Sequence, residues 1–195
     1  MEPQTIITIP NVSDITVADF NGDTNPDFAI SAGGTVQPWF GNGSGTTFNP
    51  GAVVSGFNLA QTIIAHDLDD DGDLDLSSGN AYTLNNGSGK SAARIGFTQT
   101  GDRITVGDLN GDGKTDIIAT DNSQNTPNVR VFLGNGSGAF TLLAKFETRG
   151  YANGLEVADV NNDNNLDVVG IGAWGGTPYA DVSGRWKRLL YECAS

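Results

Sequence analysis

Six aspartates occupy nine residues in the segment DLDDDGDLD, residues 67–75, which directly follows His66, the only histidine of the chain. Two carboxylates about 4 Å apart repel each other by roughly 4 kcal/mol at an effective dielectric constant near 20. A compact turn of this composition therefore needs a counter-charge. Because carboxylate and carbonyl oxygens are the ligands that hard cations prefer, the segment predicts a cation-binding loop.

The segment is one of four related segments, each nine residues long. They are DFNGDTNPD from Asp19, DLDDDGDLD from Asp67, DLNGDGKTD from Asp108 and DVNNDNNLD from Asp159. Numbered from the first aspartate, positions 1, 5 and 9 are always Asp, and position 3 is Asn or Asp. Positions 4 and 6 are mostly Gly, Asn or Asp, which tolerate a left-handed backbone, and Thr24 is the exception.

The spacing of the acidic residues indicates how a cation would be held. Position 7 includes Lys114, whose ammonium cannot bind a cation, so a shared geometry requires the backbone carbonyl at this position. An EF-hand also binds its ion through side chains at positions 1, 3 and 5 and a backbone carbonyl at position 7. However, an EF-hand needs Glu at position 12 and flanking helices as well. Closure by Asp at position 9 instead suits a loop between two antiparallel strands. Oxygen ligands alone favour calcium, with magnesium as the weaker alternative.

A simpler interpretation is that Asp and Asn only populate turns through bonds from their side chains to the backbone. Four loops with the same ligand positions argue against it.

Each acidic segment lies between short β-type runs, and a second motif recurs between the segments: FGNGSG at 40–45, NNGSG at 85–89 and LGNGSG at 133–138. Asn-Gly between β-type runs is a strong hairpin signal. Each repeat is thus predicted to form four strands in roughly 40 to 50 residues, the size of one propeller blade. We expect an all-β fold of four β-propeller blades, forming a partial or small propeller, with almost no helix before residue 183.

These motifs resemble the FG-GAP/VCBS repeat, the blade of integrin-alpha-like β-propellers. The resemblance covers about residues 12–171 and implies calcium-binding hairpin loops between the first two strands of each blade. It implies these ligands, with position 7 acting through its carbonyl: Asp19, Asn21, Asp23, Asn25 and Asp27; Asp67, Asp69, Asp71, Asp73 and Asp75; Asp108, Asn110, Asp112, Lys114 and Asp116; Asp159, Asn161, Asp163, Asn165 and Asp167. About four Ca²⁺ ions are therefore expected.

The predicted organisation is a propeller region over residues 1–182, with repeats starting near 12, 60, 101 and 152, and a non-repeat tail over 183–195. The tail is interpreted as a capping helix, a linker or a segment foreign to the repeats. Residues 5–10 are predicted to be an outer strand that either closes a small ring beside the fourth repeat or belongs to a piece of a larger propeller. Residues at three offsets should lie between blades: Ile15, Val17, Phe20, Ile63, Ala65, Leu68, Ile104, Val106, Leu109, Leu155, Val157 and Val160.

The composition limits the partners. A formal charge of −13 and a pI near 4.1 argue against nucleic acids and anionic membranes, which bind basic patches. No run of 18 apolar residues occurs, so no membrane insertion is expected, and the first ten residues do not have the form of a signal peptide. Open propeller ends predict self-association.

No enzymatic activity is expected, because no Ser or Cys nucleophile motif accompanies His66, for which both a structural and a ligand-contacting role stay open. Three functional classes remain open: a recognition or adhesion module of a secreted or cell-surface protein that binds protein or glycan, an accessory propeller of a secreted polysaccharide-active enzyme, and a structural spacer. The resemblance favours the first of these and an extracellular location.

Overall fold

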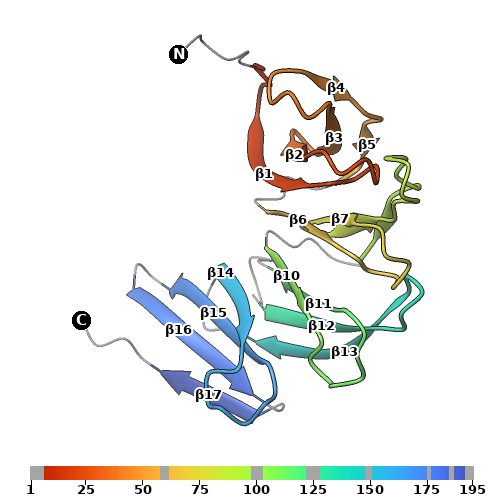
Figure 1. The fold of residues 1–195 in the computed structure, drawn as a ribbon. Coiled ribbons are helices and arrows are strands. Elements are labelled where there is room, and N and C mark those ends of the chain that lie inside the picture. The colour runs from red at the N-terminus through yellow and green to blue at the C-terminus, as the bar shows by residue number, and fades with distance from the viewer. Residues whose placement is uncertain are drawn as a thin grey trace. The chain divides into compact units, whose positions relative to one another are not determined.

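The computed structural model describes residues 7–57, 62–97, 103–121, 128–147, 151–174, 177–184 and 187–191. Within these ranges the chain forms four antiparallel sheets and no helix (Figure 1). None of the described residues belongs to a helix that could cross a membrane. The chain divides into two compact units, which are residues 1–67 with 71–98 and residues 68–70 with 99–195. The first unit holds the first two sheets, and the second holds the last two.

Consecutive strands pair in every sheet. The first sheet has the order β1 (Val12–Ala18), β2 (Asp27–Ala32), β3 (Thr35–Gly41) and β4 (Phe48–Pro50), and β5 (Val54–Ser55) also pairs with β3. The second is β6 (Ile63–His66), β7 (Asp75–Ser78), β8 (Ala81–Thr83) and β9 (Ile95–Gly96). The third is β10 (Ile104–Gly107), β11 (Asp116–Asp121), β12 (Asn128–Gly134) and β13 (Phe140–Glu147). The fourth is β14 (Tyr151–Ala158), β15 (Asp167–Trp174), β16 (Thr177–Gly184) and β17 (Lys187–Tyr191).

The prediction of an all-β fold is confirmed, and the second, third and fourth sheets have the predicted four strands, whereas the first has a fifth, β5. In every sheet the first strand ends one residue before position 1 of the acidic loop, and the second strand begins at position 9. The acidic loops therefore connect the first and second strands of their sheets, as the sequence predicts.

The fourth sheet differs from the predicted tail over residues 183–195. Gly184 pairs with Lys187, and β17 runs back along β16 to form the last strand of the sheet. Strand pairing is made by the backbone, so this segment completes the sheet without an Asn-Gly motif. At the other end of the chain, residues 5 and 6 of the predicted outer strand lie outside the described residues, and Ile7–Pro10 form no strand.

Apolar side chains between the sheets of each unit form its core. Most of the predicted interior residues are buried or half-buried, and Phe20, Ile63, Leu68, Ile104 and Leu155 are the most enclosed of them. The prediction is wrong for three positions: Ile15 and Val17 are 55% and 66% exposed, and Val160 is 51% exposed. These three lie on the faces of the first and fourth sheets that point away from the other sheet of their unit. A sheet face is buried only where another layer covers it.

Candidate metal centres

The four acidic loops share one backbone course, which is set by the aspartate at position 1. In every loop the backbone N–H of position 6 donates a hydrogen bond to Oδ2 of this aspartate. The bonds are Thr24 to Asp19 at 2.7 Å, Gly72 to Asp67 at 2.9 Å, Gly113 to Asp108 at 2.8 Å and Asn164 to Asp159 at 2.8 Å. The loop therefore curls round the carboxylate of position 1.

Two further hydrogen bonds recur at positions 3 and 5 of the loops. The N–H of position 7 donates to Oδ1 of the aspartate at position 5 in all four loops, at 2.8 to 3.0 Å. The N–H of position 5 donates to Oδ1 of the asparagine at position 3 in the first, third and fourth loops, also at 2.8 to 3.0 Å. In the second loop, carboxylate oxygens of Asp67, Asp69 and Asp71 lie within 4.8 Å of one another. The four loops thus share a hydrogen-bond pattern, and ligation through the carbonyl at position 7 stays a prediction.

Positions 4 and 6 adopt the left-handed backbone in all four loops. At position 4 the φ angles are 71° at Gly22, 59° at Asp70, 77° at Gly111 and 59° at Asn162. At position 6 they are 69° at Thr24, 91° at Gly72, 80° at Gly113 and 65° at Asn164. Thr24, the exception in the sequence pattern, therefore adopts the same conformation as its counterparts. A β-branched residue is strained there, because its Cβ substituents crowd the backbone.

We expect Thr24→Gly to stabilise the chain by about 0.5–1 kcal/mol, since removal of the strained side chain outweighs the extra entropy of glycine in the unfolded state. The change leaves the bond from the backbone N–H of residue 24 to Asp19 intact. Asn164→Gly at the same position of the fourth loop is the control, because Asn already tolerates this backbone and gains little. Urea denaturation measures both, and a Thr24→Gly variant less stable than the native chain would contradict the assignment of strain.

The aspartate at position 9 is buried and joins the acidic loop to the GNGSG hairpin. Oδ2 accepts from the N–H of position 2 in three loops: Phe20 to Asp27 at 2.9 Å, Leu109 to Asp116 at 2.9 Å and Val160 to Asp167 at 3.1 Å. Oδ1 accepts from the N–H at the start of the hairpin: Gly41 to Asp27 at 2.8 Å, Asn85 to Asp75 at 2.7 Å and Gly134 to Asp116 at 3.0 Å. The sequence pattern identified this aspartate only as a ligand.

The fourth loop lacks the second of these bonds. Oδ1 of Asp167 is buried and has no hydrogen-bond partner among the described residues, although the residue is only 1% exposed. A buried carboxylate oxygen without a partner is costly unless a proton or a cation compensates its charge. A carboxylate oxygen that accepts one N–H bond also retains a lone pair, so position 9 can still bind a cation in the other loops.

The environment changes the acidity of two loop carboxyls in opposite directions. Burial raises the pKa of Asp116 above its usual 3.8, although the N–H groups of Gly134 and Leu109 oppose the shift. The backbone N–H of Asn25 lowers the pKa of Asp23 below 3.8, so its carboxylate is the charged form. The pKa shifts of exposed Asp23 and buried Asp116 thus have different causes.

The glycine of each Asn-Gly-Ser-Gly hairpin that directly follows the asparagine lies against position 7 of the acidic loop in its own repeat. A Cβ on Gly43 would collide with the side chain of Asn25, and one on Gly87 would collide with Asp73. A Cβ on Gly136 would collide with the side chain of Asp70 in the second loop and would lie 3.3 Å from Cδ of Lys114. The sequence pattern explained these glycines by turn geometry alone, and no sequence signal marks this contact between separate motifs.

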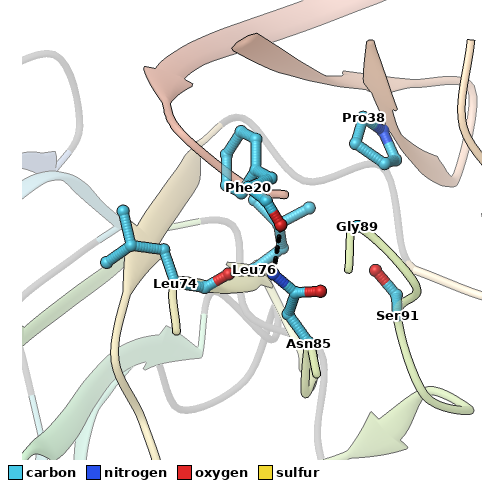
Figure 2. A pocket seen from close by; sticks show the side chains of 7 residues that line it. All are labelled: Phe20, Pro38, Leu74, Leu76, Asn85, Gly89 and Ser91. Carbon is cyan, nitrogen blue, oxygen red and sulfur yellow. Dashed lines mark hydrogen bonds between the residues drawn. The ribbon is translucent and has the colours of Figure 1, made fainter. Parts of the chain in front are cut away.

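Asn85 connects the first two sheets (Figure 2). Its side-chain nitrogen donates to the carbonyl oxygens of Phe20 at 2.7 Å and Leu74 at 3.2 Å. The crevice that these residues line with Pro38, Leu76, Gly89 and Ser91 has essentially no volume open to water. It is a packed contact between sheets and not a ligand site.

A cavity of about 280 Å³ lies between the third and fourth acidic loops. The position 1 aspartates of both loops, Asp108 and Asp159, line it together with Leu109, Gly111, Asn164, Asn165 and Leu166. Solvent ions can therefore reach these carboxylates. His66 is exposed at the end of β6, and its ligand-contacting role stays a prediction.

Residues 108–170 match the family model of the FG-GAP-like repeat. The match begins at position 1 of the third acidic loop and ends in β15, so it contains the third and fourth acidic loops. The resemblance to this repeat family is confirmed over that segment, which indicates a β-propeller-type module. The acidic loops of the first two sheets share with the third and fourth loops the bonds from positions 6 and 7 to the aspartates at positions 1 and 5. No curated protein matches the sequence.

Proposed function

We propose that each acidic loop binds one Ca²⁺ ion and that the chain is a calcium-stabilised recognition or adhesion module of a secreted or cell-surface protein. The ligands are the side chains at positions 1, 3, 5 and 9 and the backbone carbonyl at position 7. A set of oxygens alone suits a hard cation, and calcium accepts the irregular geometry that such a loop offers. The ion supplies positive charge that compensates the clustered carboxylates.

The observation that supports this proposal most strongly is the common hydrogen bonding of the four loops. Backbone N–H groups donate to both carboxylate oxygens at position 1 of the first, third and fourth loops and to Oδ1 at position 5 of all four, so they fix the orientation of these carboxylates. The buried Oδ1 of Asp167 adds an acceptor that nothing in the described residues satisfies. Turn formation alone does not require such an atom. Four divalent ions would change the formal charge of −13 to about −5, which reduces self-repulsion.

Isothermal titration of the calcium-free chain tests the proposal directly. We expect about four bound ions per chain, with dissociation constants of about 10⁻⁴ to 10⁻³ M, as in other extracellular calcium modules. Asp71→Asn removes a charged ligand at position 5 of the second loop and should remove or weaken one site. Glu147→Gln, an exposed acidic residue outside the loops, is the matched control for the loss of one charge. Equal titrations of both variants and the native chain would refute ligation by Asp71.

The recognition function rests on the module class and not on an identified ligand. The clustered carboxylates are assigned to the loops, where bound calcium would prevent them from acting as proton donors, so we take the module to be non-enzymatic. Its partner is a protein or a glycan. A glycan-array screen with and without calcium tests for a glycan partner. Binding that survives removal of calcium would show that recognition does not depend on the metal sites.

A further inference from the structure

Both units bury the same set of positions between their two sheets. In the first unit, Phe20, Ala29 and Val36 of the first sheet pack in one cluster with Ile63 and Leu76 of the second, and Ala65 packs against it. In the second unit, Ile118 and Val129 of the third sheet pack with Leu155 and Val168 of the fourth, and Leu109 and Val157 pack against them. By their distance from the acidic loops or by their strand pairing, these are equivalent residues in the two units. In each unit, the earlier sheet therefore contributes the positions of Phe20, Ala29 and Val36 to the contact. The later sheet contributes the positions of Ile63, Ala65 and Leu76.

The second sheet buries one of its faces against the first sheet, and the equivalent face of the first sheet is exposed at Ile15 and Val17, half-buried at Phe28 and Trp39, and buried at Ile30. The counterparts of Ile63, Ala65 and Leu76 are Ile15, Val17 and Phe28. Val17 pairs with Phe28, and Phe28 pairs with Trp39, so all three side chains lie on the same side of the sheet. Phe28 and Trp39 stack with their ring centroids 5.9 Å apart, and Phe48 packs edge-on to Phe28 at 5.0 Å. This outer face of the first sheet is apolar and aromatic.

The fourth sheet leaves exposed the face that corresponds to the buried face of the first sheet. Val160, Val169 and Ile171 are the counterparts of Phe20, Ala29 and Ser31. Val160 and Ile171 are both more than half exposed, and Val169 is half-buried. In the first unit the corresponding Phe20 is almost fully buried against the next sheet. This outer face of the fourth sheet therefore carries apolar side chains at positions that are buried between the two sheets of the first unit, but here they are exposed.

We propose that the outer face of the fourth sheet of one copy docks on the outer face of the first sheet of a second copy. This contact would repeat the packing between the two sheets of each unit. The outer face of the fourth sheet corresponds to the buried face of the first sheet, and the outer face of the first sheet corresponds to the buried face of the second. Such an interface is head-to-tail and uses different surfaces on the two copies.

A hydrogen bond in the first unit indicates which positions meet across the interface. Oγ of Ser78 donates to Oγ of Ser31 at 3.5 Å, and Ser78 is the cross-strand partner of Ile63. The counterparts of Ser31 and Ile63 are Ile171 and Ile15. Ile171 of one copy should therefore lie beside Ile15 of the other.

Light scattering coupled to gel filtration tests the proposal at about 100 μM chain, a concentration that populates interfaces of micromolar affinity. We expect a mass of at least twice the 20.3 kDa chain mass. Because each copy carries a charge of −13, association should strengthen when salt is raised from low to physiological concentration. Ile15→Lys and Ile171→Glu should each return the chain to a monomer, since each places an uncompensated charge in an apolar contact. Val53→Lys changes an equally exposed residue between β4 and β5 and should have no effect.

Mixing the two charged variants distinguishes a head-to-tail contact from a symmetric one. In the mixture, the unchanged fourth sheet of the Ile15→Lys variant can dock on the unchanged first sheet of the Ile171→Glu variant, so a native contact forms. The mixture should therefore recover the dimer mass. Circular dichroism of each variant checks that the sheets remain folded. A native chain that stays monomeric at all salt concentrations would overturn the proposal. So would loss of the dimer in Ile15→Lys alone, which would indicate contact between two copies of the first sheet.

Discussion

Excess EDTA is expected to lower the melting temperature of the chain by about 10–20 °C or to unfold it at room temperature. At a calcium concentration ten times the dissociation constant, each occupied site adds about 1.4 kcal/mol, and four sites add about 5–6 kcal/mol. This is comparable to the whole stability of a typical domain. For a chain of this length, 1 kcal/mol corresponds to about 2–4 °C in melting temperature.

Differential scanning calorimetry with stepwise return of calcium measures this effect. The second loop should fill first, because it alone has an aspartate at position 3. Magnesium at the same concentration is the control and should restore much less, since it gives up its bound water reluctantly. A melting curve that EDTA leaves unchanged would show that the loops are stabilised by their own hydrogen bonds.

The second large effect is expected from Gly134→Ala, which should destabilise the chain by about 3 kcal/mol. A Cβ at residue 134 would collide with the backbone carbonyl of Thr115, and neither strand can move without disturbing the bond from the N–H of Gly134 to Asp116. The hairpin and the acidic loop of the third repeat would therefore separate. Urea denaturation in calcium measures the loss.

Gly113→Ala in the same repeat is the control for this change. Gly113 has a φ of 80°, but a Cβ there meets no atom within 4 Å. It should cost only the backbone strain of about 1–2 kcal/mol. Equal losses in the two variants would show that the collision at Gly134 relaxes without cost.

The acidic loops could be predicted in detail because their conformation is local. Positions 4 and 6 need a left-handed backbone, and the residues that tolerate it are visible in the sequence, so the strand boundaries on both sides follow. Even Thr24 adopts the backbone of its counterparts, although its own preference opposes it. The pattern shared by four loops therefore predicts the backbone of Thr24 better than the preference of threonine alone does.

Features that depend on distant segments could not be predicted. The contact between Gly43 and Asn25 joins two motifs whose proximity follows only from the pairing of the strands between them. β17 has no turn motif before it, because its place in the sheet is determined by backbone pairing with β16. Ile15 and Ile63 have the same sequence environment, yet one is exposed and the other buried. That difference depends on which sheet face has a neighbour.

The bonds of the position 9 aspartates also affect how the chain folds. Those that Asp27, Asp75 and Asp116 accept from the hairpins join residues 14, 10 and 18 positions apart, so they close short loops. Short loops close quickly and at small entropic cost. Folding is therefore expected to start in any repeat and to spread from one sheet to the next, as in other repeat proteins. The fourth repeat, where Asp167 lacks the hairpin bond, should be the last to become protected from hydrogen exchange.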